Sequence, residues 1–162
     1  MLVSSKGMHS TKAFLTVINI NLLGTFLCSK YAANHLKDLP LLPSGRERGV
    51  IINVSSVAAT EGQRGQISYS ASKAGVSGMT LPMARDLGRF KIRVVTIAPG
   101  VFKTPMLSPM NEKFFAAMKA QAATGELGQI SDFANLVGGV ASNEYLNGTV
   151  IRLDGGLHLP HL

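Results

Sequence analysis

The sequence predicts an α/β fold with a parallel sheet, on three observations. Two β-branched runs, Val50–Val54 and Ile92–Ile97, show little polar alternation, which is typical of strands covered on both faces. Segments with helical spacing surround these runs, in the order helix, strand, helix, strand, helices, strand. Such alternation favours right-handed crossovers between parallel strands. The chain has 162 residues, 46% of them hydrophobic, and therefore fits one domain with its own core.

One long helix dominates the first part of the chain. Residues 1–10 contain several small and polar residues and are expected to form a loop. From Thr11 to about Asp38, apolar residues recur at spacings of three and four, which predicts a long, mostly buried helix over residues 11–38. We expect it to end before Pro40, because the following loop is interrupted by proline and glycine.

The middle of the chain predicts a strand, a helix and a second strand. Val50–Val54 (residues 50–54) is the first strand, and a loop of small residues follows it from Ser55 to Gln66. Tyr69–Phe90 (residues 69–90) is the next helix, and Pro82 is expected to kink it or interrupt its hydrogen bonds. Ile92–Ile97 (residues 92–97) is the second strand.

The last third predicts two helices and a final strand. Ser108 is a suitable N-cap for a helix with Pro109 as its first residue, and Ser131 for a short helix to about Ala141. Val150–Leu153 (residues 150–153) is the last strand. Three strands make a thin sheet, because doubly wound sheets carry about five or six. This suggests that strands are missing at the N-terminus.

Composition excludes several classes of protein. The only cysteine is Cys28, so an internal disulfide is excluded, and a zinc site is not expected. A reducing, intracellular compartment follows as the expectation, and the polar start of the chain lacks the apolar segment of a signal peptide. Wholly apolar runs are far shorter than the about 18 residues that a membrane span needs, so no span is expected.

The net charge of +7 raises the alternative of a basic nucleic-acid-binding module. The basic residues are scattered, however, and the sequence has no tryptophan and only three tyrosines to interleave with them. A solvated basic surface that attracts a phosphorylated ligand is therefore the favoured interpretation, and we expect no nucleic-acid partner.

Tyr69 and Lys73 are the strongest candidates for chemistry. They are four residues apart on a predicted helix and therefore lie on one face. An ammonium at that spacing favours the ionised phenolate, as a general acid/base requires. Ser56 and the turn Pro99-Gly100 follow two strand ends, where parallel sheets bind ligands. Asn21 lies within an apolar helix, and composition alone favours a core amide bonded to backbone.

Five motifs together resemble the short-chain dehydrogenase/reductase family. In order along the chain they are Asn21-Leu22-Leu23-Gly24-Thr25-Phe26, Ile52-Asn53-Val54-Ser55-Ser56, Tyr69-Ser70-Ala71-Ser72-Lys73, Ile97-Ala98-Pro99-Gly100 and Leu153-Asp154-Gly155-Gly156. The segments 61–66, 78–87 and 146–155 further resemble the branch of mitochondrial 3-hydroxyacyl-CoA and 17β-hydroxysteroid dehydrogenases.

The resemblance implies roles for the candidate residues. Tyr69 would be the general acid/base, Lys73 would assist it and hold the nicotinamide ribose, and Ser56 would orient the substrate oxygen. Asn21 would anchor a water in a proton relay. Further residues would contact the nicotinamide end of the cofactor (Pro99, Gly100 and Thr104) or lie near the substrate (Gln63). No metal is implied.

The resemblance also implies ligands and partners. The substrate would be a small hydroxy or keto compound, and the cofactor NAD or NADP, with NAD favoured by the branch. The helices over residues 11–38 and 69–90 would form a homodimer or homotetramer. Helices within residues 109–141 would form the substrate loop.

Departures from the family pattern bear on the function. No Gly-x-x-x-Gly-x-Gly turn is present, because Gly7 is the only glycine before Gly24. We therefore expect the C-terminal part of a Rossmann-like doubly wound sheet, without the N-terminal nucleotide-binding strands. Lys103 stands where the branch often has glycine, and the segment 121–126 departs from the usual substrate loop.

Two functions stay open beside the nucleic-acid alternative. One is an NAD(P)-dependent alcohol dehydrogenase. The other is a catalytically inactive fragment that associates with subunits of this family. Mitochondrion and cytoplasm are not distinguished by this sequence.

Overall fold

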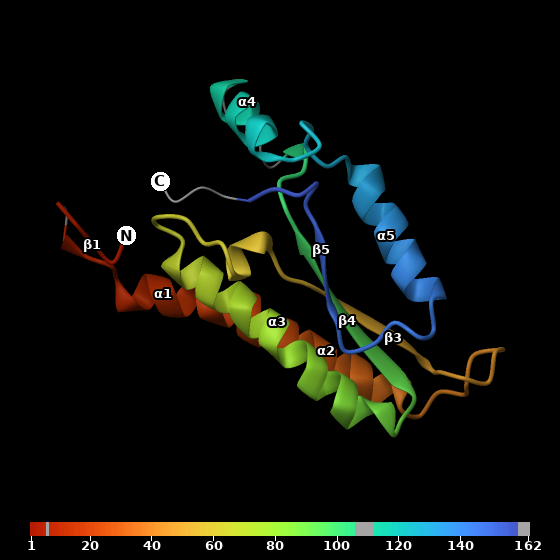
Figure 1. Ribbon diagram of the computed structural model, residues 1–162. Helices are drawn as coiled ribbons and strands as arrows, with labels where there is room; N and C mark the ends of the chain where they lie inside the picture. The colour runs from red at the N-terminus through yellow and green to blue at the C-terminus, as the bar shows by residue number, and fades with distance from the viewer. Residues whose placement is uncertain (6, 106–111, 159–162) are drawn as a thin grey trace.

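The structure, a computed structural model, describes residues 1–5, 7–105 and 112–158. Its central sheet has three parallel strands in the order β3-β4-β5 (Figure 1): β3 (Gly49–Val54), β4 (Ile92–Pro99) and β5 (Val150–Leu153). Val54 pairs with Ile97, and Thr96 pairs with Val150. The carboxyl ends of β3 and β4 therefore lie at one edge of the sheet. The expected parallel α/β architecture is confirmed.

Helices lie on both sides of this sheet (Figure 1). On one side, α1 (Thr11–Val17), a π-helical turn (Ile18–Leu23) and α2 (Gly24–Leu36) form one continuous helix that lies beside α3 (Ile67–Gly88). On the other side lies α5 (Ile130–Ser142), and α4 (Glu112–Gln121) lies beyond the carboxyl ends of the strands. A short 3-10 helix, η2 (Val57–Ala59), follows β3.

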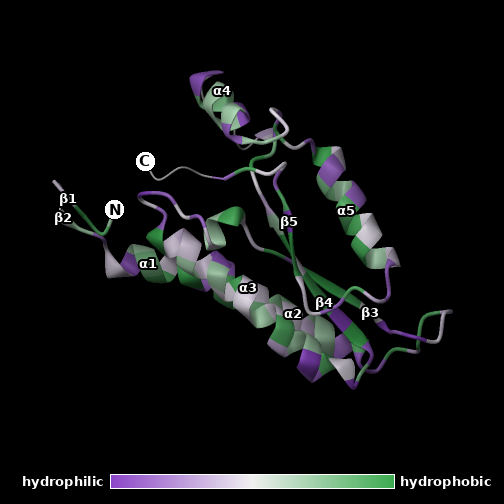
Figure 2. Ribbon diagram, in the orientation of Figure 1, coloured by the Kyte–Doolittle hydropathy of each residue, from purple (hydrophilic) through white to green (hydrophobic). Residues whose placement is uncertain are grey.

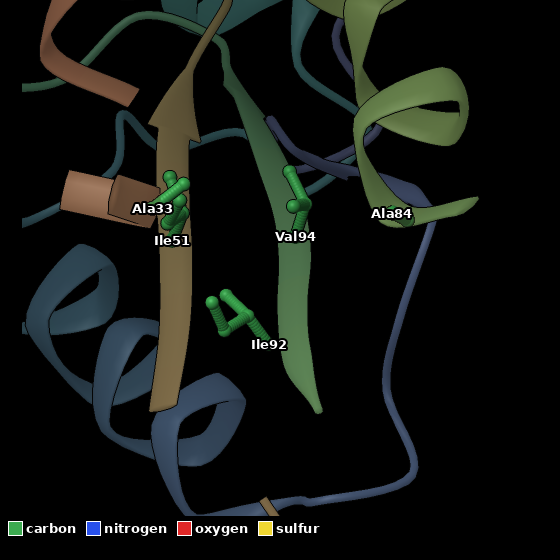
Figure 3. Packing of buried hydrophobic residues seen from close by; sticks show 5 residues of the cluster. All are labelled: Ala33, Ile51, Ala84, Ile92 and Val94. Carbon is green, nitrogen blue, oxygen red and sulfur yellow. The ribbon is translucent and has the colours of Figure 1, made fainter. Parts of the chain in front are cut away.

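The core is centred on β4, in which every residue from Ile92 to Ala98 is buried. Ile92 and Val94 pack with Ile51 of β3, Ala33 of α2 and Ala84 of α3 (Figure 3). Burying one such valine or isoleucine contributes about 1.5–3 kcal/mol relative to leaving it exposed. The hydropathy colouring shows the same concentration of apolar residues in β3 and β4 (Figure 2).

A buried ion pair fastens β4 to the segment before β3 and to the end of α5. The Nε and Nη2 groups of Arg93 both donate to the Glu47 carboxylate, the latter at 3.1 Å, and both residues are about 95% buried. The other N–H groups donate to the carbonyls of Val140, Ala141 and Leu146 at 2.9–3.1 Å. All five donors of the guanidinium are therefore used, as its burial requires.

Two expectations about individual elements were wrong. Residues 1–10 are not only a loop, because β1 (Val3–Ser4) and β2 (Gly7–Met8) pair as a short antiparallel hairpin. Ser131 does not cap α5. Gln129 occupies the N-cap and forms a reciprocal capping box with Asp132, which satisfies two backbone donors at once.

Several element boundaries differ from those expected. The helix containing Pro82 is continuous from Ile67 to Gly88 and so begins and ends two residues earlier. Strand β4 extends to Pro99, two residues further than expected, and the first long helix ends at Leu36. The proposed cap Ser108 and Pro109 lie outside the described residues.

The helix over residues 11–36 is mostly exposed rather than mostly buried. Only Ser29 and Ala33 of this helix are buried. Its large exposed apolar residues are Leu15, Ile20, Leu23, Phe26, Leu27 and Tyr31, which we call the outer face. One side of the helix packs on α3, and nothing among the described residues covers the other side. Helical periodicity predicts an apolar side but not what covers it.

The same helix is long and apolar enough to be a candidate membrane span. The segment Thr11–Leu36 has a mean hydropathy of 1.4 in an 18-residue window, none of which is buried. The expectation of no span rested on the length of uninterrupted apolar runs. Mean hydropathy is instead averaged over the 18 residues of a window, so isolated polar residues do not interrupt it. One such helix is weak evidence for a membrane, and α3 packs along it.

We expect the isolated chain to associate and to melt at a low temperature. Strand β3 ends the described sheet with an unpaired edge, and the outer face is apolar, both of which favour contact with another chain. Light scattering coupled to gel filtration tests this. Phe26→Glu, within the outer face, should reduce association, whereas Tyr145→Glu, at an exposed aromatic outside that face, should not. A sharp monomer of 17.2 kDa that melts cooperatively above about 60 °C would contradict the expectation.

Candidate active site

Tyr69 and Lys73 meet at the carboxyl end of β3. Tyr69 lies in the first turn of α3, and the Nζ atom of Lys73 is 5.8 Å from the centre of its ring. Lys73 also donates from Nζ to the carbonyl of Val54, at 3.0 Å. Burial lowers the pKa of the Lys73 ammonium. Tyr69 is 36% exposed, so the lysine charge acts on the phenol through a medium between the protein interior and bulk water in its screening.

Two serines follow β3 and have different roles. Ser55 is buried, donates from Oγ to the carbonyl of Lys73 at 2.8 Å, and lies 2.8 Å from the Oγ of Ser77. It therefore fastens α3 to the end of the strand. Ser56 is half-buried, and its Oγ accepts from the backbone of Ala58 at 3.1 Å as the cap of η2. Ser55 was not predicted as a functional residue, although the pair of adjacent serines after the strand was a signal for it.

Asn21 is joined to the first turn of α3 through Ser72. Its Nδ2 atom donates to Ser72 Oγ at 3.1 Å, and Ser72 Oγ donates to the carbonyl of Tyr69 at 2.6 Å. The expectation of a core amide bonded to backbone was wrong, because the partner is a hydroxyl. Asn21 lies in the π-helical turn Ile18–Leu23, a local irregularity that is frequent at functional sites. Ser72 was also missed, although it stands inside the Tyr69–Lys73 motif.

Gln63 lies in the loop that leads into α3. Its backbone N–H donates to Gln66 Oε1 at 2.9 Å, which closes a turn. The preceding Gly62 packs against α3 so closely that a Cβ atom there would lie 2.2 Å from Ser70 Oγ. Among the described residues, no hydrogen bond joins Gln63 to Tyr69 or Lys73. The structure therefore places Gln63 near the start of α3 without bonding it to the pair.

An ion network ties this loop to the end of β5. Arg152 donates to Glu61 at 2.7 Å and forms an ion pair with Asp154 at 2.6 Å, and His158 Nδ1 is 3.1 Å from Glu61. The hydrogen bond to Glu61 raises the pKa of Arg152, with Asp154 adding to the effect. Arg152 and Glu61 are 91 positions apart, so no local pattern in the sequence could have paired them.

The remaining candidates lie at or beyond the end of β4. Gly100 donates from its backbone N–H to the carbonyl of Leu153 at 2.9 Å, and a Cβ atom at Gly100 would lie 2.7 Å from that of Asp154. The close packing of the segments at the ends of β4 and β5 is therefore enough to require glycine at position 100. Pro99 ends β4, and Thr104 is half-buried in the following loop. Among the described residues, no hydrogen bond joins Thr104 to Tyr69 or Lys73.

Metal ligands are not grouped in the described part of the chain. Over residues 1–5, 7–105 and 112–158, no cluster of three or more His, Cys, Asp and Glu side chains could hold a metal ion. The candidate residues that the structure places at this edge of the sheet carry hydroxyl, phenol, amide and ammonium groups.

Comparison with known proteins decides the family. A family model described as enoyl-(acyl carrier protein) reductase matches residues 5–158. The mouse protein named 3-hydroxyacyl-CoA dehydrogenase type-2 is 48% identical over 154 residues, which are 94% of this chain. The chain belongs to the short-chain dehydrogenase/reductase family. The rat (3R)-3-hydroxyacyl-CoA dehydrogenase is 40% identical over 145 residues, 88% of this chain.

A solved structure supports the same conclusion about the fold. The crystal structure of 3-hydroxyacyl-CoA dehydrogenase type-2 from Mycobacterium avium superposes with a TM-score of 0.93 at 35% identity and covers 98% of this chain. This short-chain dehydrogenase/reductase chain covers 62% of that structure, 58% of the mouse relative and 54% of the rat relative. The chain thus spans little more than half the length of its curated relatives.

Proposed function

We propose that this chain provides the acid–base centre of a nicotinamide-dependent oxidoreductase that transfers hydride reversibly between a secondary alcohol and a ketone. The observation that carries the proposal is the Lys73 ammonium, held by the Val54 carbonyl beside the ring of Tyr69. The names of the mouse and rat relatives favour a 3-hydroxyacyl thioester as the alcohol. A hydroxysteroid-like alcohol is the alternative substrate.

Each polar group would have a distinct role. During reduction, the Tyr69 hydroxyl donates its proton to the ketone oxygen, and in the reverse direction the phenolate accepts that proton from the alcohol. The Ser56 hydroxyl orients the same oxygen, and the charge of Lys73 stabilises the phenolate. Asn21, joined to α3 through Ser72, anchors the far end of a proton relay. Gln63 borders the substrate.

The residues present fit the nicotinamide half of a dinucleotide. An ammonium has three N–H donors, and the Val54 carbonyl takes one from Lys73, so two others suit the ribose hydroxyls. Pro99, Gly100 and Thr104 would border the nicotinamide end. When bound, the cofactor, NAD in preference to NADP, accepts or supplies the hydride at the carbinol carbon. The sequence lacks the family's glycine-rich turn for the pyrophosphate.

We therefore expect the 162-residue chain to bind NADH and NADPH weakly. The residues that fit the dinucleotide cover one half of it, and the pyrophosphate lacks a glycine-rich turn at a helix N-terminus. Calorimetric titration of the purified chain with each nucleotide measures this directly. A dissociation constant in the low micromolar range for either nucleotide would contradict the expectation.

Transfer of isotope tests the proposed reaction. The test uses a fusion protein in which the part of the mouse relative that this chain does not match is joined ahead of residue 1. We call this protein the mouse fusion. This fusion is given acetoacetyl-CoA and NADH carrying deuterium at the transferable C4 position. We expect one deuterium on the carbinol carbon of the product, and none with the mouse segment alone. A folded fusion that binds NADH but transfers no deuterium would contradict the proposal.

A second function, association with subunits of the family without activity, is favoured by the unpaired edge of β3 and the exposed outer face. In that case the chain binds full-length relatives through its helices over residues 11–36 and 67–88. An intracellular location, in the mitochondrion or the cytoplasm, belongs to both proposals and is supported by the single cysteine.

A further inference from the structure

A hollow beside Lys103 contains none of the residues proposed for the acid–base chemistry. Its volume is about 270 Å³, and its lining residues are Lys103, Phe115, Lys119, Glu126, Leu127 and Gln129. Its lining residues belong to α4 and to the loops that follow β4 and α4. Figure 1 shows α4 beyond the carboxyl ends of the strands. We call it the Lys103 hollow.

Backbone hydrogen bonds hold Lys103 at the wall of this hollow. Its N–H donates to the carbonyl of Gly128 at 2.9 Å, and the N–H of Gly128 donates to the carbonyl of Val101 at 3.1 Å. Phe102 pairs with Gly128 as an isolated parallel bridge. The two loops are therefore joined like short strands, and the position of Lys103 does not depend on its own side chain.

The charges around the Lys103 hollow leave one positive charge in excess. Lys119 forms an ion pair with Glu126 at 2.7 Å, and Lys103 adds a second ammonium. The side chains of Lys119 and Glu126 are 45% and 67% exposed. Exposed ion pairs contribute little, so an arriving anion can compete with Glu126 for Lys119. The excess charge selects an anion.

The inner surface of the hollow is apolar. Leu127 is buried, and Phe115 packs against Phe114 with ring centres 5.7 Å apart. Such a surface favours a hydrocarbon group, because its contact removes apolar area from water. Ammonium groups beside an apolar surface therefore match a ligand that carries both an anion and a hydrocarbon.

We propose that the Lys103 hollow binds an amphipathic anion, a phosphate or carboxylate attached to a short hydrocarbon group. The ammonium of Lys103 faces the anion, and Phe115 and Leu127 contact the hydrocarbon. This inference goes beyond the proposed hydride transfer and needs neither a cofactor nor turnover.

Calorimetry with three matched probes tests the proposal on the 162-residue chain. Octyl phosphate and octanoate share a hydrocarbon and differ in the anion, and octanol lacks the charge. We expect Lys103→Gln to weaken binding of at least one anionic probe by about tenfold, as loss of a charge-assisted contact implies. Lys103→Arg should retain binding. Lys12→Gln, at an exposed lysine of α1, is the matched control and should bind as the parent does.

Each outcome decides the proposal. Preference for octyl phosphate identifies the anion as a phosphate, preference for octanoate as a carboxylate, and both support the site if Lys103→Gln weakens binding. The proposal is overturned if neither anion binds, if octanol binds as tightly as the anions, or if Lys103→Gln and Lys12→Gln behave alike. Because the assay contains no nucleotide, failure of the hydride-transfer proposal would leave these outcomes unchanged.

Discussion

Replacing Glu47 by alanine is expected to lower the free energy of unfolding by about 3–5 kcal/mol, because Arg93 would keep a buried charge without its counterion. Both residues are about 95% buried, and the carboxylate takes two of the five donors of the guanidinium. The carbonyls of Val140, Ala141 and Leu146 would still accept three hydrogen bonds but carry no neutralising charge.

Urea unfolding of the mouse fusion measures this effect. The matched control is Glu144→Ala, which removes the half-buried partner of the exposed Arg46, 3.3 Å away, and is expected to change the free energy by less than about 1 kcal/mol because Arg46 stays in water. Glu47→Gln, which keeps the shape and an acceptor, should fall between the two. If Glu47→Ala and Glu144→Ala are equally stable, the ion pair does not support the fold in the way described.

The sequence predicted the parts of the site that rest on local spacing. Tyr69 and Lys73 lie on one helix face at a spacing of four, and Ser56 follows a strand, so helix and strand geometry alone brought them to one edge. The parallel sheet followed from β-branched runs alternating with helices in the same way.

Contacts between distant positions could not be predicted in this way. Glu47 and Arg93 are 46 positions apart, and Glu61 and Arg152 are 91 apart, so the pairing of each depends on the finished fold. The exposure of the helix over residues 11–36 depends on which element covers its outer face, and periodicity shows only that an apolar side exists. The strands of the N-terminal hairpin, two residues each, are too short to show a period.

Replacing Tyr69 by phenylalanine is expected to reduce turnover in the mouse fusion by about 100- to 10,000-fold, the usual contribution of general acid–base catalysis. The substitution keeps the ring, and with it the packing of α3, but removes the hydroxyl that carries the proton. Tyr31→Phe is a closely matched control. Tyr31 also has a lysine ammonium over its ring, that of Lys30 at 5.6 Å, yet it lies on the exposed outer face of α2.

The role of Tyr69 as general acid/base is tested by the rate at which the mouse fusion reduces acetoacetyl-CoA with NADH, compared between these two variants. We expect Tyr69→Phe to lower kcat/KM by at least about 100-fold while the fusion still binds NADH, and Tyr31→Phe to stay within about twofold of the parent. If Tyr69→Phe stays within about tenfold of the parent, Tyr69 is not the general acid/base, and the acid–base centre assigned to this chain is wrong.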